Sequence, residues 1–213
     1  MKMVMNGMEW VAKMAYLNIL WLLFSLVGLV LFGFFPATMA MFAIIRQWLL
    51  GNIYEWNIKL FLKIYRQEFW KSNLIGAVFL VIIFLSYVNF QYIAYYESAI
   101  HQLIKIPLLV VMMLIVVAIL YVMPVYVHYD ISLKEVFKYA VYLMLLHPLA
   151  NLGMIISLAV VLLSFALLPN TAIFFLGSVT AYIIMRTCLH IFTNLSEKQA
   201  ILQLQGKTIT DKY

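Results

Sequence analysis

The sequence predicts an all-α, polytopic membrane protein: one membrane domain of about five transmembrane helices, with short interfacial helices on the cytoplasmic side. Hydrophobic residues make up 67% of the 213 residues and charged residues only 10%, a composition typical of integral membrane proteins. One bilayer crossing needs about 20 consecutive apolar residues. Five stretches approach or exceed that length, at 14–45, 74–96, 106–127, 149–168 and 171–192.

The first stretch is too long for one straight helix perpendicular to the membrane. Its 32 uncharged residues would span about 48 Å as a helix, against a hydrocarbon core about 30 Å thick. Gly33 and Pro36 mark the expected kink, because proline removes a backbone donor and clashes with the preceding turn. The kink would either let a long helix pack around the bundle or act as a hinge or part of a binding cavity.

The polar segment after the first crossing predicts an interfacial helix at about 57–73. Apolar residues recur there at helical spacing, with basic residues around the opposite side. Trp48, Trp56 and Trp70 lie in or beside this segment. The pattern favours anchoring in the headgroup plane or docking of a partner protein, and the two are compatible. With Arg66, these tryptophans are the candidate partner-contact residues.

A second short helix is predicted between the third and fourth crossings. Residues 132–135 fit a capping box, in which a serine and a glutamate side chain satisfy backbone N–H groups at a helix start. This helix should end at Pro148, where the chain enters the membrane again. Just before it, His128 and Asp130 are placed to cap a helix or to pair with Arg186 of the last crossing.

The distribution of Lys and Arg predicts the orientation. Five crossings place the termini on opposite sides, with eleven of the 14 basic residues on one side and only Lys2, Lys13 and Lys105 on the other. Basic residues concentrate in cytoplasmic loops, so the N-terminus is expected outside and the C-terminus in the cytoplasm. The net charge of +6 lies in membrane-flanking loops, which suits anionic lipids and argues against a nucleic-acid partner.

Catalytic groups do not stand out. Intramembrane catalysis needs paired groups, and proton-coupled transporters usually keep an acid deep in the bundle. All eight acidic residues lie near predicted helix ends or in loops, so we expect neither an enzyme nor ion coupling. The single cysteine, Cys188, and the scattered histidines do not fit a structural metal site, and no cofactor is expected.

Polar residues within the crossings have two interpretations. Asn18, Asn89 and Asn151 either form hydrogen bonds between helices or line a polar cavity together with Arg186. Arg186 is also near enough to the cytoplasmic end of its helix for the charged group to reach the interface.

Several motifs resemble those of a known family. They are Asn18–Trp21, Phe32–Ala40, Arg46–Gly51, Phe61–Asn73 and His147–Leu149. Together they are similar to the signature of the YesL-like proteins, small integral membrane proteins of Gram-positive bacteria whose function is unknown. Members tend to be encoded beside carbohydrate importers of the ATP-binding-cassette (ABC) type and sugar-responsive histidine kinases.

The resemblance implies a non-enzymatic accessory or regulatory protein, acting with an ABC-type importer in carbohydrate uptake or with a histidine kinase in sugar sensing. The family has no established catalytic residues, so none carry over to this chain. The alternative is a small transporter or channel, acting alone or as an oligomer. That alternative requires a continuous cavity lined by the four polar residues of the crossings, which an accessory protein does not need.

Overall fold

The computed structural model describes the backbone of residues 2–52, 58–95 and 99–210, and the side chains of 7–52, 58–92 and 105–197. Throughout these ranges the regular structure is helical, without strands. Eight helices follow in order: α1 Lys2–Val27, α2 Leu31–Leu49, α3 Ile58–Gln67, α4 Phe69–Tyr95, α5 Ala99–His128, α6 Leu133–Leu146, α7 Pro148–Leu167 and α8 Pro169–Thr210. All except α3 and α6 are long and apolar enough to cross a membrane. The chain is a polytopic helical membrane protein.

The predicted first crossing is two helices, so the described chain has six candidate spans where the sequence analysis expects five. α1 ends at Val27 and α2 begins at Leu31. The chain reverses through Leu29 and Val30, whose φ angles are +58° and +64°. α1 is also longer than expected, because it continues through Lys13, whose charge is paired with Glu9 at 2.7 Å one helical turn earlier.

Two glycines permit this reversal. A Cβ atom on Gly33 would collide with the carbonyl oxygen of Ser25, and one on Gly28 would collide with the Cα of Gly33. Neither position has room for a larger residue without a shift of the backbone. The expected kink was placed at Gly33 and Pro36, but the chain turns before them and both residues lie inside α2.

Pro36 interrupts the backbone hydrogen bonding of α2. Because proline has no N–H, the carbonyl of Phe32, four residues earlier, loses its usual helical donor. The side-chain amide of Asn73 on α4 donates to that oxygen at 3.0 Å. A neighbouring helix therefore satisfies the carbonyl that the proline leaves free, as membrane helices require.

Helix α2 is the centre of the molecule. It packs against α1, α3, α4, α5 and α8, and about half of its candidate span is buried, compared with 6% for α7. Small side chains at Ala37 and Ala40, both fully buried, allow close approach of the neighbouring helices. The apolar surface of α7 is correspondingly left for contact with lipid.

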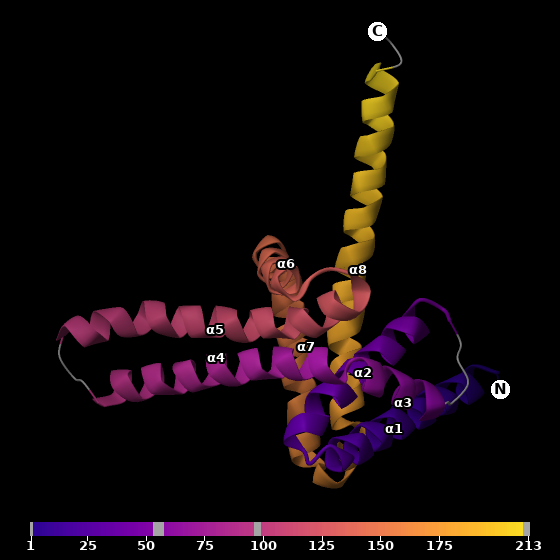
Figure 1. Cartoon of the computed structure of the whole chain (residues 1–213), viewed down its shortest axis with the longest axis horizontal. Coiled ribbons are helices and arrows are strands. Elements are labelled where there is room, and N and C mark those ends of the chain that lie inside the picture. Colours follow the sequence, from indigo (N-terminus) through magenta and orange to yellow (C-terminus); the bar gives the residue numbers. More distant parts are fainter. Residues whose placement is uncertain (1, 53–57, 96–98, 211–213) are drawn as a thin grey trace.

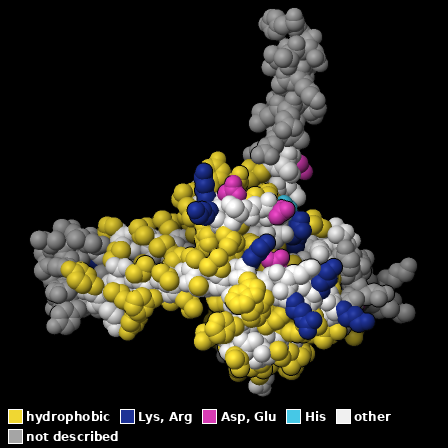
Figure 2. Space-filling view, in the orientation of Figure 1, with side chains coloured by type: hydrophobic (Ala, Val, Ile, Leu, Met, Phe, Trp, Pro, Cys, Tyr) yellow, Lys and Arg dark blue, Asp and Glu magenta, His cyan; other side chains and the backbone are white. Residues whose placement is uncertain are grey.

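Two long helical hairpins extend from this centre in different directions. In Figure 1 the α4–α5 hairpin runs to the left and the α7–α8 hairpin runs vertically, with α8 continuing beyond the rest of the molecule. The visible surface of the α4–α5 hairpin is mainly hydrophobic in Figure 2. On α7, large apolar side chains are exposed from Leu149 to Leu167. The four helices of the two hairpins correspond to the last four predicted crossings, although α8 continues to Thr210, well past the predicted end at 192. The two short helices, α3 and α6, connect the spans. The interfacial helix predicted over 57–73 is shorter than expected, because α3 ends at Gln67 and residues 69–73 belong to α4.

Candidate functional site

A pocket of about 510 Å³ lies where the ends of several helices meet. The end of α2, the α3–α4 junction, the end of α5 and the loop before α6 form its walls. Its ionisable and polar lining residues are Arg46, Glu68, Lys71, Tyr126, His128, Tyr129, Asp130 and Ser132. In Figure 2 the visible acidic and basic side chains lie over the middle and right of the molecule, whereas the α4–α5 hairpin on the left is mainly hydrophobic. The ionisable side chains around this one hollow make it the candidate functional site.

One wall is fixed by a contact between α2 and α5. Nε of Arg46 donates a hydrogen bond to Nδ1 of His128 at 3.2 Å. Arginine carries only donors, so Nδ1 must accept, and the imidazole is neutral with its proton on Nε2. The ring of His128 packs against Phe192 of α8, with 4.5 Å between the ring centres. The contact thus joins three helices.

A second contact holds α5 to the α3–α4 junction. The hydroxyl of Tyr126 donates to a carboxylate oxygen of Glu68 at 2.5 Å. A hydrogen bond to an ionised acceptor is shorter and stronger than one between neutral groups. Glu68 is therefore held on the pocket wall by an uncharged partner.

The start of α6 forms the remaining wall. The predicted capping box is present: the carboxylate of Glu135 accepts from the backbone N–H of Ser132 at 2.9 Å and from its hydroxyl at 2.7 Å. Both hydrogen bonds lower the pKa of Glu135, and the one from the Ser132 hydroxyl has the larger effect. In the preceding loop, burial raises the pKa of Tyr129, as does the nearby Tyr139, so the phenol of Tyr129 stays neutral at physiological pH.

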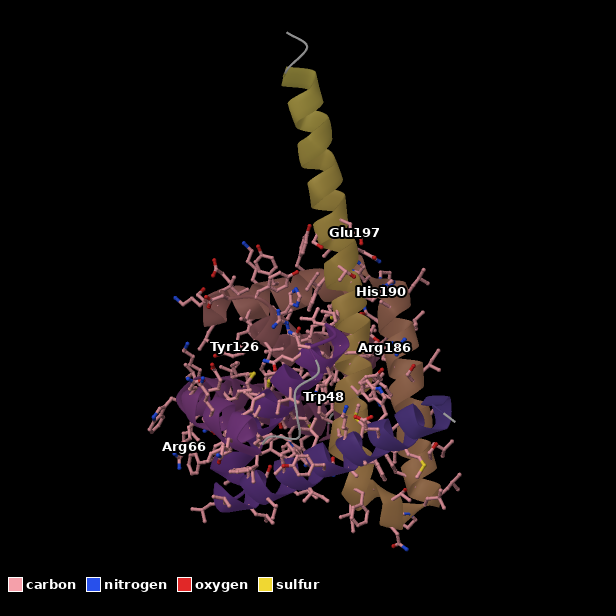
Figure 3. All side chains as sticks on the ribbon, turned by 90° about the vertical axis from the view of Figure 1, so that its right-hand side faces the viewer. Trp48, Arg66, Tyr126, Arg186, His190 and Glu197 are labelled. Carbon is pink, nitrogen blue, oxygen red and sulfur yellow. The ribbon has the colours of Figure 1, made fainter. Side chains whose placement is uncertain are left out.

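The four predicted partner-contact residues have different environments. Trp70 is 83% exposed at the start of α4, and Arg66 is exposed at the end of α3. Figure 3 shows Arg66 at the outer edge of the molecule. Trp48 is partly buried and packs edge-on against Trp10, with 6.0 Å between ring centres. Trp56 lies outside the described residues.

Helix α3 turns its apolar side inward. Phe61 and Tyr65 are buried and pack against Phe24 of α1, with ring-centre distances of 5.1 and 5.3 Å. Burial raises the pKa of Tyr65. Since these two large apolar side chains are covered by protein, the basic side of α3 is the one that remains exposed.

The four residues expected to line a cavity have separate roles. Asn18 is buried and joins α1 to α8, donating to the Ile173 carbonyl at 2.7 Å and accepting from the Ser178 N–H at 2.9 Å. Asn151 accepts from the Tyr121 hydroxyl at 2.6 Å and donates to the Met144 carbonyl at 2.8 Å. Both asparagines hold helices together.

The other two lie on exposed surfaces. Asn89 donates to the Leu85 carbonyl of its own helix, and Arg186 donates to the Tyr182 hydroxyl one turn away. Figure 3 shows Arg186 below His190 along α8, on the opposite side of that view from Arg66. None of the four residues lines the candidate pocket.

The sequence places the pocket residues near helix ends but does not bring them together. It predicts His128 and Asp130 as helix caps or as partners of Arg186, whereas His128 is bonded to Arg46 of α2. Charged or polar residues at the ends of long apolar runs were the available signal. Within the part of the chain that the structure describes, no three His, Cys, Asp or Glu side chains gather as they would around a metal ion.

Comparison with known proteins relates the chain to one family. The family model described as "Protein of unknown function, DUF624" matches residues 14–90. Three proteins of Bacillus subtilis (strain 168) are similar over most of their length. YesV is 35% identical over 79% of this chain and 81% of its own. YteU is 33% identical over 84% and 80%, and YesL is 28% identical over 92% and 94%.

Among solved structures, none matches the chain significantly. The family match covers Arg46, Glu68 and Lys71 of the pocket but ends before α5. The relatives are named as uncharacterized proteins.

Proposed function

The chain belongs to the YesL-like, DUF624 family of membrane proteins of unknown function, and from that premise we propose that it is a non-enzymatic accessory or regulatory membrane protein. It would bind an ABC-type carbohydrate importer or a sugar-sensing histidine kinase and influence its activity. The genomic surroundings typical of the family support this choice of partner. The structure supports the mode of action, through one exposed surface.

That surface, the α3–α4 face, consists of Lys63, Arg66 and Trp70. All three are exposed, Trp70 by 83% of its surface. Tryptophan and arginine are among the residues most enriched at the energetic centres of protein interfaces. Helix α3 is fixed in position beneath this face, because its inner residues Phe61 and Tyr65 pack into the hydrophobic core. An acidic segment of a partner would complement its positive charge.

The intramembrane polar residues support an accessory role over transport. Asn18 and Asn151 use their side chains to join helices, and Asn89 bonds within its own helix. A transport pathway would need such groups to face a common water-filled space. Here two of the three join helices, and the third bonds to the backbone of its own helix.

The proposal also includes an orientation. Six spans are an even number and would place both termini on one side of the membrane. Thirteen of the 14 Lys and Arg residues would then share that side, leaving only Lys105 on the other. This asymmetry exceeds that of the five-crossing arrangement with its N-terminus outside. By the positive-inside rule, both termini and the α3–α4 face would be cytoplasmic.

Purification in mild detergent from the native host, with identification of the membrane proteins that co-purify, tests the function. Trp70→Ala and Arg66→Gln should each weaken recovery of the partner, by about 1 kcal/mol or more if the residue is an energetic centre. Tyr142→Ala is the matched control, since Tyr142 is an exposed aromatic residue on α6. If the purified protein instead moved a sugar or ion across liposomes, and Arg186→Gln abolished that flux, the transporter alternative would replace this proposal.

A further inference from the structure

The candidate pocket is lined by charged side chains of both signs, all described by the structure, that form no direct ion pair with one another. Two cations, Arg46 and Lys71, and two carboxylates, Glu68 and Asp130, line it. Arg46 and Glu68 are half-buried, whereas Lys71 and Asp130 are exposed. Among the described side chains the ion pair found is Lys13–Glu9, far from the pocket in sequence and on α1. The four pocket charges are therefore separated around a common hollow.

The hydrogen bonds of the two half-buried charges are made to neutral groups. Arg46 donates to the neutral imidazole of His128, and Glu68 accepts from the phenol of Tyr126. Removing a charge from water is costly unless a partner of opposite charge compensates for it. Neither neutral partner supplies such a charge, whereas a charged ligand in the pocket would.

The chemistry of that ligand follows from the lining. Arginine and lysine bind phosphate oxygens well, arginine with a fork of donors and lysine with a compact charge. Carboxylates bind a primary ammonium group, which can donate hydrogen bonds to them. A volume of about 510 Å³ is within the usual range for small-ligand sites. A ligand with both a phosphate and an ammonium group would compensate all four charges at once.

We propose that this pocket binds a phosphoethanolamine group, with its phosphate toward Arg46 and Lys71 and its ammonium toward Glu68 and Asp130. The group has two possible sources. The pocket lies at the ends of the candidate spans of α2 and α5, at Leu49 and His128, where lipid headgroups would lie. A phosphatidylethanolamine headgroup can therefore reach it, and so can a soluble phosphoethanolamine compound. This inference does not depend on the proposed partner.

Binding to the full-length protein tests the proposal. The protein is reconstituted in nanodiscs of pure phosphatidylcholine, to which phosphatidylethanolamine, soluble phosphoethanolamine, phosphocholine or inorganic phosphate is added. Binding is followed by native mass spectrometry for lipids and by calorimetry for soluble compounds. We expect binding of the ethanolamine compounds over their choline counterparts, since choline has the same charge but no N–H donors. A lipid-only response identifies the headgroup as the source, and a response to the soluble compound identifies a free ligand.

Paired substitutions locate the site. Lys71→Met with Asp130→Asn should raise the dissociation constant about tenfold or more, because each removes a charged hydrogen-bond partner. The control, Lys138→Met with Glu197→Gln, changes the same kinds of charge on exposed residues outside the pocket and should leave binding unchanged. Equal binding of ethanolamine and choline compounds, or inorganic phosphate binding as tightly as phosphoethanolamine, would overturn the proposal. That comparison uses the unmodified protein and does not depend on the variants folding.

Discussion

At the scale of single residues, a hydrogen bond from a neighbouring helix accommodates the proline inside the central helix α2. Pro36 lies within α2 and is buried, and its missing N–H leaves the carbonyl of Phe32 without its usual helical donor. Asn73 donates to the Phe32 carbonyl that the proline leaves free, at 3.0 Å, and also to the Phe69 carbonyl of its own helix at 2.8 Å. The asparagine and the proline thus act as a pair across the α2–α4 contact.

This pairing predicts energetic coupling. Asn73→Ala should destabilise the protein by about 0.6 kcal/mol, the average for an interhelical hydrogen bond in a membrane protein. In a Pro36→Ala background the cost should fall, because the new backbone N–H of residue 36 can bond the Phe32 carbonyl instead. A double-mutant cycle by unfolding in detergent measures the difference.

The matched control for that cycle is Asn89→Ala. Asn89 also donates a hydrogen bond to the carbonyl four residues earlier in α4, at 2.8 Å. Unlike Asn73, it makes no hydrogen bond to α2, whose residues the structure describes in full. The cost of Asn89→Ala should therefore be the same in the Pro36→Ala background as in the unmodified protein. If the effects of Asn73→Ala and Pro36→Ala were simply additive, the compensating role of Asn73 would be wrong.

At the scale of helices, the sequence predicts some features well and others not at all. Four of the spans follow from the length of their apolar runs, and the start of α6 follows from Ser132 and Glu135, three residues apart. These features depend on local sequence. The contacts of Arg46 with His128 and of Asn73 with Phe32 join residues 82 and 41 positions apart, and a single sequence has no local pattern that specifies them.

The turn between α1 and α2 was missed for a different reason. The residues between these helices, 28–30, are Gly-Leu-Val, which are as apolar as their surroundings. Turns are usually recognised by clusters of polar residues, glycine and proline. Leu29 and Val30 also adopt positive φ, which is uncommon for such residues. Hydropathy alone therefore merges two helices into one long run.

The α1–α2 hairpin makes a prediction about Gly33. A methyl group there would lie 2.7 Å from the carbonyl oxygen of Phe24 and closer still to that of Ser25. Both are backbone atoms that cannot rotate away. We expect Gly33→Ala to cost about 1–3 kcal/mol, as overpacking usually does, and to lower the melting temperature measured in detergent.

Gly153→Ala is the control for this substitution. Gly153 lies in α7, and a Cβ atom there would meet nothing within 4 Å. Alanine in an unobstructed helix position is slightly stabilising compared with glycine, by roughly 0.5–1 kcal/mol. Equal melting temperatures for the two variants would show that α1 and α2 do not approach as closely as the structure indicates.

At the scale of the whole molecule, charge is distributed unevenly. In Figure 2 the visible acidic and basic side chains lie over the middle and right of the molecule, and the α4–α5 hairpin is mainly hydrophobic. The pocket and the α3–α4 face share the charged side, because both include residues of the α3–α4 junction. If it is cytoplasmic, both features face the compartment in which importer ATPases and kinase domains work.

The number of spans gives the last prediction, because it decides the side of each terminus. Single cysteines are introduced at Gly7, Leu29, Gly51 and Asn170 in a Cys188→Ser background, whose native thiol is buried in α8. On intact cells, a membrane-impermeant thiol reagent should label Leu29 and Asn170, which lie in or beside the α1–α2 and α7–α8 turns and are exposed. Gly7 and Gly51 should react only after the cells are permeabilised. Labelling of Gly7 on intact cells, with Leu29 protected, would instead establish five crossings with the N-terminus outside.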